Sequence, residues 1–446
     1  MAGSTPTVAR GPGTSSHIQS HNPANPDNST VFQRTLSTAG RLGAALALTG
    51  TLASPSFAQR ASSHASHLSS GIDTTNFDHS VRPQEDFFRY VNGGWLKTAQ
   101  IPADASSWGA FQELRENSRT ALHELFEEAS KAHAPDGSAR QKVGDLYASY
   151  IDSARVEELG LTPLQPLLAK LADLKSKSDL PATLAYFARR GIRGPASVRV
   201  GADPKHSSVN IVQISQAGLG MPDRDYYLKQ DAKMVSTRAA YVTYITKMLE
   251  LAKQPDPSGA AKRILALETA ISTPQWARAR NRDRDSTYNK MTVAQLSALT
   301  PSFAWKSYLD DAGLSKAKEV IVHQPDYLKA LDPIFANTPV ATWREYLTFQ
   351  LLDSFADQLP SDFGEAGFAF RGHTLSGQEE MAARWKRAVD ATNSTLGEAA
   401  GALYAAKYFK PEAKARMGAL VKNLINAYRV GIDSLEWMSP ATKARA

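Results

Sequence analysis

Apolar residues recur every three or four positions along most of this chain. The spacing is clearest in the set Val143, Leu146, Tyr147, Tyr150 and Ile151. It places these side chains on one face of a helix. The same periodicity runs through residues 235–252, 259–272, 342–358, 376–392 and 413–435. No repeat of fixed period accompanies it, so the pattern predicts a mainly helical domain and not a helical repeat protein.

One short region alternates apolar and polar residues instead. Val198 and Val200 alternate with polar neighbours, and residues 209–215 do so in part, which is typical of a strand. The intervening Gly201-Ala202-Asp203-Pro204-Lys205 has the composition of a turn. We therefore expect a mainly α fold: a large multi-helix domain with a small β-hairpin insertion.

Local capping signals predict where two helices begin and end. Pro83 suits the first turn of a helix, and Asn92-Gly93-Gly94 is expected to stop that helix, since glycine adopts the left-handed conformation of a helix end. Near residue 446, Ser439 and Pro440 are the residue types preferred at an N-cap and at the first helical position. A short helix is expected to begin there.

Composition divides the chain into four parts. Residues 1–30 are rich in Ser, Thr, Asn, Pro and Gly, which predicts a disordered leader. Residues 31–58 are interpreted as a signal peptide. Residues 59–80, rich in Ser and His, are expected to form a flexible tether. The folded domain is expected over 81–446.

The second of these parts has the order of features of a secretory signal. Arg34 and Arg41 precede an apolar run from Leu42 to Ala53, and small residues follow up to Ala58. The run is shorter than the roughly 20 residues that span a bilayer. A buried helix is the alternative, but no amphipathic pattern accompanies it. We expect cleavage after Ala58, a periplasmic or secreted protein, and no membrane anchor.

Composition also excludes some classes of partner. Charged residues are 21% and hydrophobic residues 42% of the chain, which is ordinary for a globular protein. The net charge of +7 is modest for 446 residues, and basic residues are interleaved with acids, so no nucleic-acid partner is expected. The chain has no cysteine and therefore no disulfide.

Several short motifs follow one another in the expected domain. They are D-F-F-R-Y-V-N-G-G-W at 86–95, W-G-A-F-Q-E-L-R at 108–115, K-V-G-D-L-Y-A-S at 142–149, G-L-G-M-P-D-R-D-Y-Y-L at 218–228 and R-W-K-R at 384–387. In this order they resemble the N-terminal region of the neprilysin-like (neprilysin/endothelin-converting-enzyme type) zinc metallopeptidase family. The resemblance covers about residues 81–446.

The resemblance implies the helical part of an enzyme that hydrolyses peptides with a zinc-activated water. The catalytic helix of that family carries H-E-x-x-H, with two histidine ligands and a glutamate base. This motif occurs nowhere in the 446 residues. We therefore expect no catalytic residue, no metal ligand and no cofactor in this chain, zinc belonging to the complete family enzyme. The chain is expected to be truncated before the zincin-type catalytic domain, which would be its packing partner.

The nearest approach to the zinc motif is H-E-L-F-E at 123–127. Its fifth residue is Glu127, where the motif requires histidine. Leu125 and Phe126 belong to an apolar stripe, so His123 and Glu127 are expected on a solvated helix face. Two other charged clusters are interpreted as structural: Asp223-Arg224-Asp225 as a turn-fixing hydrogen-bond network, and the run 278–285 as locally paired arginines and aspartates.

Arg115 is the candidate substrate-binding residue. It follows Trp108 by seven and Phe111 by four positions, so the three are expected on one helix face. The arginine is either part of a structural ion pair or, as the resemblance implies, a contact to carbonyl or carboxylate oxygens of a peptide in the substrate cleft. Family members that bind a terminal carboxylate carry a second arginine where this chain has Ser107. A preference for a free carboxylate is therefore not expected.

Two functions follow from these observations. The first is the cleft-enclosing N-terminal portion of a secreted zinc metalloendopeptidase that acts on short peptides, inactive by itself. The alternative is a non-catalytic helical peptide-binding or interaction module derived from the same family.

Overall fold

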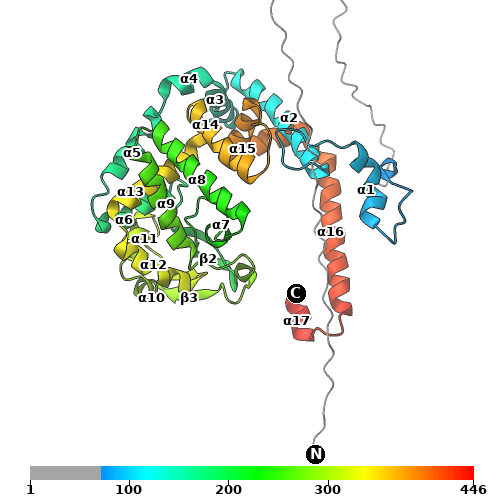
Figure 1. Ribbon diagram of the computed structural model, residues 1–446. Helices are drawn as coiled ribbons and strands as arrows, with labels where there is room; N and C mark the ends of the chain where they lie inside the picture. The colour runs from blue at the N-terminus through cyan, green and yellow to red at the C-terminus, as the bar shows by residue number, and fades with distance from the viewer. Residues whose placement is uncertain (1–71) are drawn as a thin grey trace, which may run out of the picture. The chain divides into compact units, whose positions relative to one another are not determined.

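Helices make up most of the described chain (Figure 1). The computed structural model describes residues 72–446. The predicted leader, the signal peptide and residues 59–71 of the tether lie outside the described residues. Asp73–Ala446 forms one compact unit. None of its helices combines the length and the apolar character that a membrane span requires.

The elements before the first strand are η1 (Thr74–Asn76), α1 (Phe87–Thr98), α2 (Ala110–Ser130), α3 (Ala139–Ile151), α4 (Ser153–Leu159), η2 (Thr162–Leu164), α5 (Gln165–Ala172), η3 (Lys177–Asp179) and α6 (Leu180–Ala188). The elements of the middle part are β1 (Ala196–Asp203), β2 (His206–Gln216), α7 (Asp225–Leu228), α8 (Ala232–Leu251), α9 (Pro257–Ser272), η4 (Arg280–Arg282), β3 (Asn289–Thr292), α10 (Val293–Leu299), α11 (Trp305–Asp311) and β4 (Glu319–Val322). The last elements are α12 (Pro325–Asn337), α13 (Val340–Phe355), η5 (Ala356–Gln358), α14 (Ser361–Gly367), the π-helix η6 (Phe368–Leu375), α15 (Arg384–Tyr408), α16 (Pro411–Ser434) and α17 (Pro440–Arg445). The mainly α fold is confirmed.

The predicted hairpin is confirmed and belongs to a larger sheet. Strands β1 and β2 pair antiparallel, and the sheet order is β1-β2-β4-β3. Strand β4 runs parallel to β2, with Val212 opposite Val320 and Ile214 opposite Val322. These four side chains are buried in the main core. Strands β3 and β4 were not predicted, because each is only four residues long.

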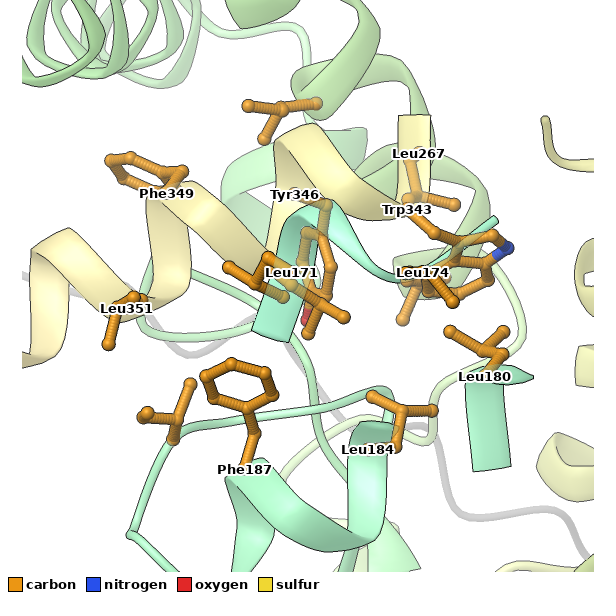
Figure 2. Packing of buried hydrophobic residues seen from close by; sticks show 14 of the residues in the cluster. Leu171, Leu174, Leu180, Leu184, Phe187, Leu267, Trp343, Tyr346, Phe349 and Leu351 are labelled. Atoms are coloured by element: carbon orange, nitrogen blue, oxygen red, sulfur yellow. The ribbon is translucent and has the colours of Figure 1, made fainter. Parts of the chain in front are cut away.

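Helix α13 lies at the centre of the main core. Figure 2 shows Trp343 and Tyr346 of this helix among leucines of α5 and α6, with Phe187 nearby. The side chains of Trp343 and Tyr346 are almost completely buried. Buried residues lie on several sides of this helix, so α13 is buried beyond the single apolar stripe predicted over 342–358.

A second core cluster holds α2, α3 and α15 together. Phe126, Val143 and Tyr147 pack there with Val389 and Ala400, all buried. Helices α2 and α3 approach closely at Gly144, where a Cβ would lie 2.6 Å from the backbone of Ala129. The predicted stripe at 143–151 therefore faces α2 and α15.

Helix α1 differs from its predicted bounds. Asp86 is its N-cap and accepts a hydrogen bond from the Arg89 amide at 2.9 Å, so Pro83 precedes the helix. The helix continues through Gly93 and Gly94. A Cβ at Gly93 would lie 2.4 Å from Cβ of Asp78, and one at Gly94 would lie 2.9 Å from a carbonyl of η1. These glycines permit close packing and do not end the helix.

The expected tether also differs in its last residues. Asp78 forms an ion pair with Lys97 of α1 at 2.8 Å, and Phe77 packs on Tyr90 with ring centroids 5.2 Å apart. Contacts of this kind place residues 73–80 in the same compact unit as the helices.

The helix predicted over 376–392 is wrong in its first half. The π-helix η6 ends at Leu375, and α15 begins only at Arg384. Between them, Gln378 and Glu380 bond to the segment before α2: Gln378 Nε2 donates to the Asp104 carbonyl at 2.9 Å, and the Glu380 amide donates to the Ala103 carbonyl at 3.0 Å. The intervening segment therefore fixes the approach to α2.

Candidate functional site

The N-terminal turns of α2 present a bare surface of aromatic, aliphatic and cationic side chains. Gly109 is the N-cap and gives no side-chain cap. Phe111 is 83% exposed, Leu114 is also exposed, and Arg115 is exposed as well. Trp108 lies before the helix, so the predicted shared helical face includes only Phe111 and Arg115. We call Phe111, Leu114 and Arg115 the α2 face.

Ion pairs beside the α2 face hold α2 against α15. Glu116 pairs with Lys386 at 3.1 Å, and Lys386 also reaches Asp104 at 2.7 Å. Arg119 pairs with Glu116 and holds Asp390 through two bonds of 3.1 and 2.9 Å. Lys386 is only 19% exposed, so its contacts are partly shielded from water, which strengthens charge-assisted bonds between α2 and α15.

The Arg115 side chain has no ion pair or hydrogen bond with any residue in 72–446. The next residue, Glu116, and Arg119, one turn later, are both paired. The structural ion pair that the sequence left open for Arg115 is therefore not formed among the described residues. The arrangement offers a guanidinium beside an exposed phenyl ring on a fixed helix, which suits an oxygen-rich ligand with apolar side chains.

His123 and Glu127 are joined through Tyr147 of α3. The Tyr147 hydroxyl lies 2.9 Å from His123 Nδ1 and donates to Glu127 Oε1 at 3.0 Å. His123 also packs on Trp385, with ring centroids 4.6 Å apart. Burial and the adjacent Glu127 carboxylate raise the pKa of Tyr147. The expected solvated face is therefore a half-buried hydrogen-bonded contact between helices.

The loop at 218–228 is fixed by the predicted turn network. The Asp225 amide donates to Asp223 Oδ1 at 2.8 Å, and Arg224 Nη1 donates to the Gln275 carbonyl at 2.8 Å. Asp223 also pairs with Arg278 at 2.7 Å. Arg278, the first residue of the run at 278–285, therefore pairs with an acid distant in the sequence, whereas local pairing within the run was expected.

Arg280 of the same run also pairs with an acid outside the run. It pairs with Asp326 at 3.3 Å and lies over the Trp276 ring at 3.5 Å from its centroid. The ion pair and the cation–π contact of Arg280 fix η4 against Trp276 and α12.

A buried carboxyl group that the sequence did not predict as a site is hydrogen-bonded to this loop. Glu268 of α9 accepts from the Tyr227 hydroxyl at 2.6 Å, from the Tyr241 hydroxyl at 2.9 Å and from Gln350 Nε2 at 3.0 Å. Burial raises the pKa of Glu268 to about 7, while the hydrogen bonds from the tyrosines oppose this rise. The signal available in the sequence was a single acid on the apolar stripe that includes Ile264 and Ile271.

Two glycines of the loop have a steric role. Gly218 has φ +93°, and a Cβ there would lie 2.7 Å from Cα of Pro195. A Cβ at Gly220 would lie 1.9 Å from the Tyr241 hydroxyl oxygen. The Tyr227 hydroxyl accepts from the Met221 amide at 3.0 Å. The loop backbone is thus seated directly on the Glu268 network.

The described residues do not fit the zinc ion that the family motif implies. No three His, Asp or Glu side chains converge in the part of the chain that the structure describes. His123 and Glu127, which have the nearest spacing, bond to Tyr147. No step of a zinc-dependent reaction is therefore assigned to residues of this chain.

Comparisons with known proteins identify the relatives of this arrangement. The family model described as peptidase family M13 matches residues 83–446. Endothelin-converting enzyme 1 of Mus musculus is 27% identical over 383 residues, which are 83% of this chain and 49% of the relative. Endothelin-converting enzyme-like 1 of Rattus norvegicus is 28% identical over 390 residues, 84% of this chain and 50% of the relative. The chain spans about half the length of the curated relatives that it matches.

Solved structures agree with this assignment. The zinc metalloprotease ZMP1 of Mycobacterium tuberculosis, in complex with an inhibitor, matches with a TM-score of 0.77 and 36% identity, covering 84% of this chain and 57% of that chain. PEPO of Lactobacillus rhamnosis HN001 matches with a TM-score of 0.69 and 23% identity, covering 82% and 58%; at this identity it shows the fold alone. The chain belongs to peptidase family M13, as the N-terminal region of a neprilysin-like zinc metallopeptidase.

Proposed function

We propose that this chain is the cleft-enclosing portion of a secreted zinc metalloendopeptidase that acts on short peptides. In this proposal the α2 face contacts the peptide, and a separate catalytic half supplies the zinc and the general base. The chain alone neither binds catalytic zinc nor hydrolyses peptides.

The observation that carries the proposal is the unpaired state of Arg115. Glu116, the next residue, and Arg119, one turn later, form ion pairs with α15. Arg115 and Phe111 stay exposed to solvent on a helix that these pairs hold in place. A guanidinium donates to carbonyl or carboxylate oxygens in a fixed fork, and the exposed phenyl ring offers apolar area to a neighbouring side chain.

The composition of the α2 face favours internal peptide segments over free carboxylate ends. Ser107, at the position where carboxylate-binding members carry a second arginine, has its hydroxyl engaged by Gln112 Nε2 at 3.1 Å. A single guanidinium is then left to hold the substrate main chain. We therefore assign endopeptidase activity to the complete enzyme.

Helix α16 supports the requirement for a catalytic half. None of its residues is buried, yet its apolar residues follow helical spacing. They are Met417, Leu420, Val421, Leu424, Ile425 and Tyr428. A stripe of this kind normally faces a partner. We propose the catalytic half of the family as that partner.

Export is the other part of the proposal. The predicted signal peptide at 31–58 supports it, as does the lack of cysteine-based anchoring. Expression in a bacterial host with and without residues 31–58, followed by N-terminal sequencing of the exported chain, tests this part. Export and cleavage after Ala58 are expected. Retention of the intact N-terminus in the cytoplasm would contradict it.

Peptide binding by the purified chain tests the α2 face directly. A fluorescent peptide of mixed apolar sequence, blocked at both ends, is titrated against the chain, Arg115→Ala and Arg140→Ala. Arg140 is exposed and forms no ion pair with a described residue, so it is the matched control. We expect Arg115→Ala to weaken binding about fivefold to tenfold, equivalent to roughly 1 kcal/mol, and Arg140→Ala to leave it unchanged. Equal affinities in all three proteins would rule out this role of Arg115.

A further inference from the structure

A slot opens at the sheet, between β2 and the segment 313–318 that leads into β4. Its volume is about 610 Å³. Its walls include Val200 and Val209 of the hairpin and Lys290, Lys316 and Lys318 on the other side. None of these residues belongs to the α2 face, so the slot is a separate feature of the molecule.

The backbone of β2 is open along this slot. The ladder between β2 and β4 includes only Val212, Gln213 and Ile214 of β2, whereas β2 begins at His206. The Ile214 carbonyl accepts from the His323 amide next to β4. Because strand backbone groups alternate in direction, the N–H and C=O of Asn210 point to the same side as those of Ile214. There they meet no strand, so β2 presents an unpaired edge.

The side chains of the slot combine apolar and cationic character. Val200, which pairs with Val212, is 54% exposed, and Val209, in the bulge of β2, is 55% exposed. Lys290 is held by Glu319 at 3.1 Å and by Asp203 at 3.8 Å. Lys316 and Lys318 are exposed and have no ion pair with any residue in 72–446. The slot therefore carries unneutralised positive charge beside a free strand edge.

We propose that this slot binds an extended acidic peptide segment by strand addition to β2. The main chain of the peptide pairs with the edge at Asn210, apolar side chains cover the two valines, and alternate carboxylates reach Lys316 and Lys318. Ala202 and Asp203 of β1 pair with Asn210 and His206 of β2, so residues 207–209 form a bulge before the regular free edge at Asn210. The bound segment therefore pairs at Asn210, next to this bulge. The slot holds peptide through backbone bonds and charge, independently of the α2 face.

The test uses the full chain and a fluorescein-labelled Val-Glu-Val-Glu-Val-Glu peptide, with the lysine-for-glutamate version as the second probe. Anisotropy is measured in about 0.1 M salt with three variants. Lys316→Glu/Lys318→Glu reverses the free charges, and Asn210→Pro removes the edge N–H. Lys262→Glu/Lys329→Glu makes the same change in net charge at two other exposed lysines that form no ion pair with a described residue.

Saturable binding of the acidic peptide is expected, with affinity at least about tenfold lower in Lys316→Glu/Lys318→Glu and in Asn210→Pro, and unchanged in the control pair. The thermal transition of each variant identifies any loss of folding. If Asn210→Pro does not fold, the affinity of Lys316→Glu/Lys318→Glu for the acidic peptide tests the proposal by itself. Equal binding of both peptides, or equal affinity in the lysine pair and the control pair, would overturn the proposal. So would a dimer in sedimentation that Asn210→Pro converts to monomer without peptide binding, because a second copy would then fill the slot.

Discussion

Glu268→Gln isolates the effect of a buried acid on the stability of this fold. Glutamine is neutral at every pH and has nearly the same shape. Glu268 is completely buried and accepts from Tyr227, Tyr241 and Gln350. The substitution therefore keeps the volume of the core and removes one titration.

The magnitude follows from the pKa of Glu268, which burial raises from 4.5 to about 7. Because the folded pKa is raised, the folded state keeps the proton over a range in which the unfolded state has lost it. The stability from neutral Glu268 is therefore complete below about pH 4.5 and is lost as the pH rises through about 7. At about 1.4 kcal/mol for each pH unit, the full effect is about 3.5 kcal/mol.

Urea denaturation of both proteins from pH 5 to 8.5 measures this effect. Other groups titrate equally in both, so the difference in unfolding free energy reports Glu268 alone. The advantage of the wild-type protein over Glu268→Gln is expected to shrink by about 2–3 kcal/mol across this range. A difference that stays constant with pH, or that grows as the pH rises, would refute the reasoning.

Three further predictions concern packing and charge. Gly220→Ala places a Cβ 1.9 Å from the Tyr241 hydroxyl oxygen and should destabilise the chain by about 1–3 kcal/mol in thermal denaturation. Gly431→Ala, where an added Cβ would meet no atom within 4 Å outside the local helix backbone and the neighbouring residues, is the control and should be neutral or slightly stabilising. Lys386→Met leaves Asp104 without its cation and Glu116 with Arg119 alone, and it should lower the unfolding free energy by about 1–3 kcal/mol. Lys131→Met breaks an exposed pair and should change the unfolding free energy by less than about 0.5 kcal/mol. Equal losses in the two variants would contradict the shielding of Lys386. Leu420→Lys/Leu424→Lys on α16 should leave the melting temperature nearly unchanged and reduce self-association in light scattering, whereas a large drop in melting temperature would show that α16 is buried in solution.

Local signals in the sequence predicted local structure well. The Ser439 side chain caps α17 by accepting from the Thr442 amide at 3.3 Å. The alternation around Val198 and Val200 produced the hairpin. Both depend on contacts within a few residues, where residue type decides the conformation.

Features that depend on distant partners were not predictable in the same way. Gly93 and Gly94 have the composition of a helix end, but η1 packs against them and the helix continues. Strand β4 pairs with a strand more than 100 positions earlier, Val320 opposite Val212, and no local pattern encodes that register.

The candidate site shows the same division. Arg115 could be identified because it belongs to a contiguous motif. Its exposure, and the ion pairs that hold α2 against α15, could not be predicted because they depend on where α15 packs. Glu268 gave only an acid in an apolar stripe, and the meaning of that acid depends on Tyr227 and Gln350, which lie 41 and 82 positions away. Tertiary contacts decide which polar residues in a stripe are buried.

The central claim is that this chain encloses a peptide cleft but lacks the catalytic centre. The most direct test is peptide hydrolysis by the purified chain, with zinc content measured on the same sample, before and after mixing with the part of the M. tuberculosis protease beyond the region that this chain covers. The account predicts no stoichiometric zinc and no hydrolysis by the chain alone, and chelator-sensitive hydrolysis after mixing. Stoichiometric zinc with chelator-sensitive hydrolysis in the chain alone would contradict it.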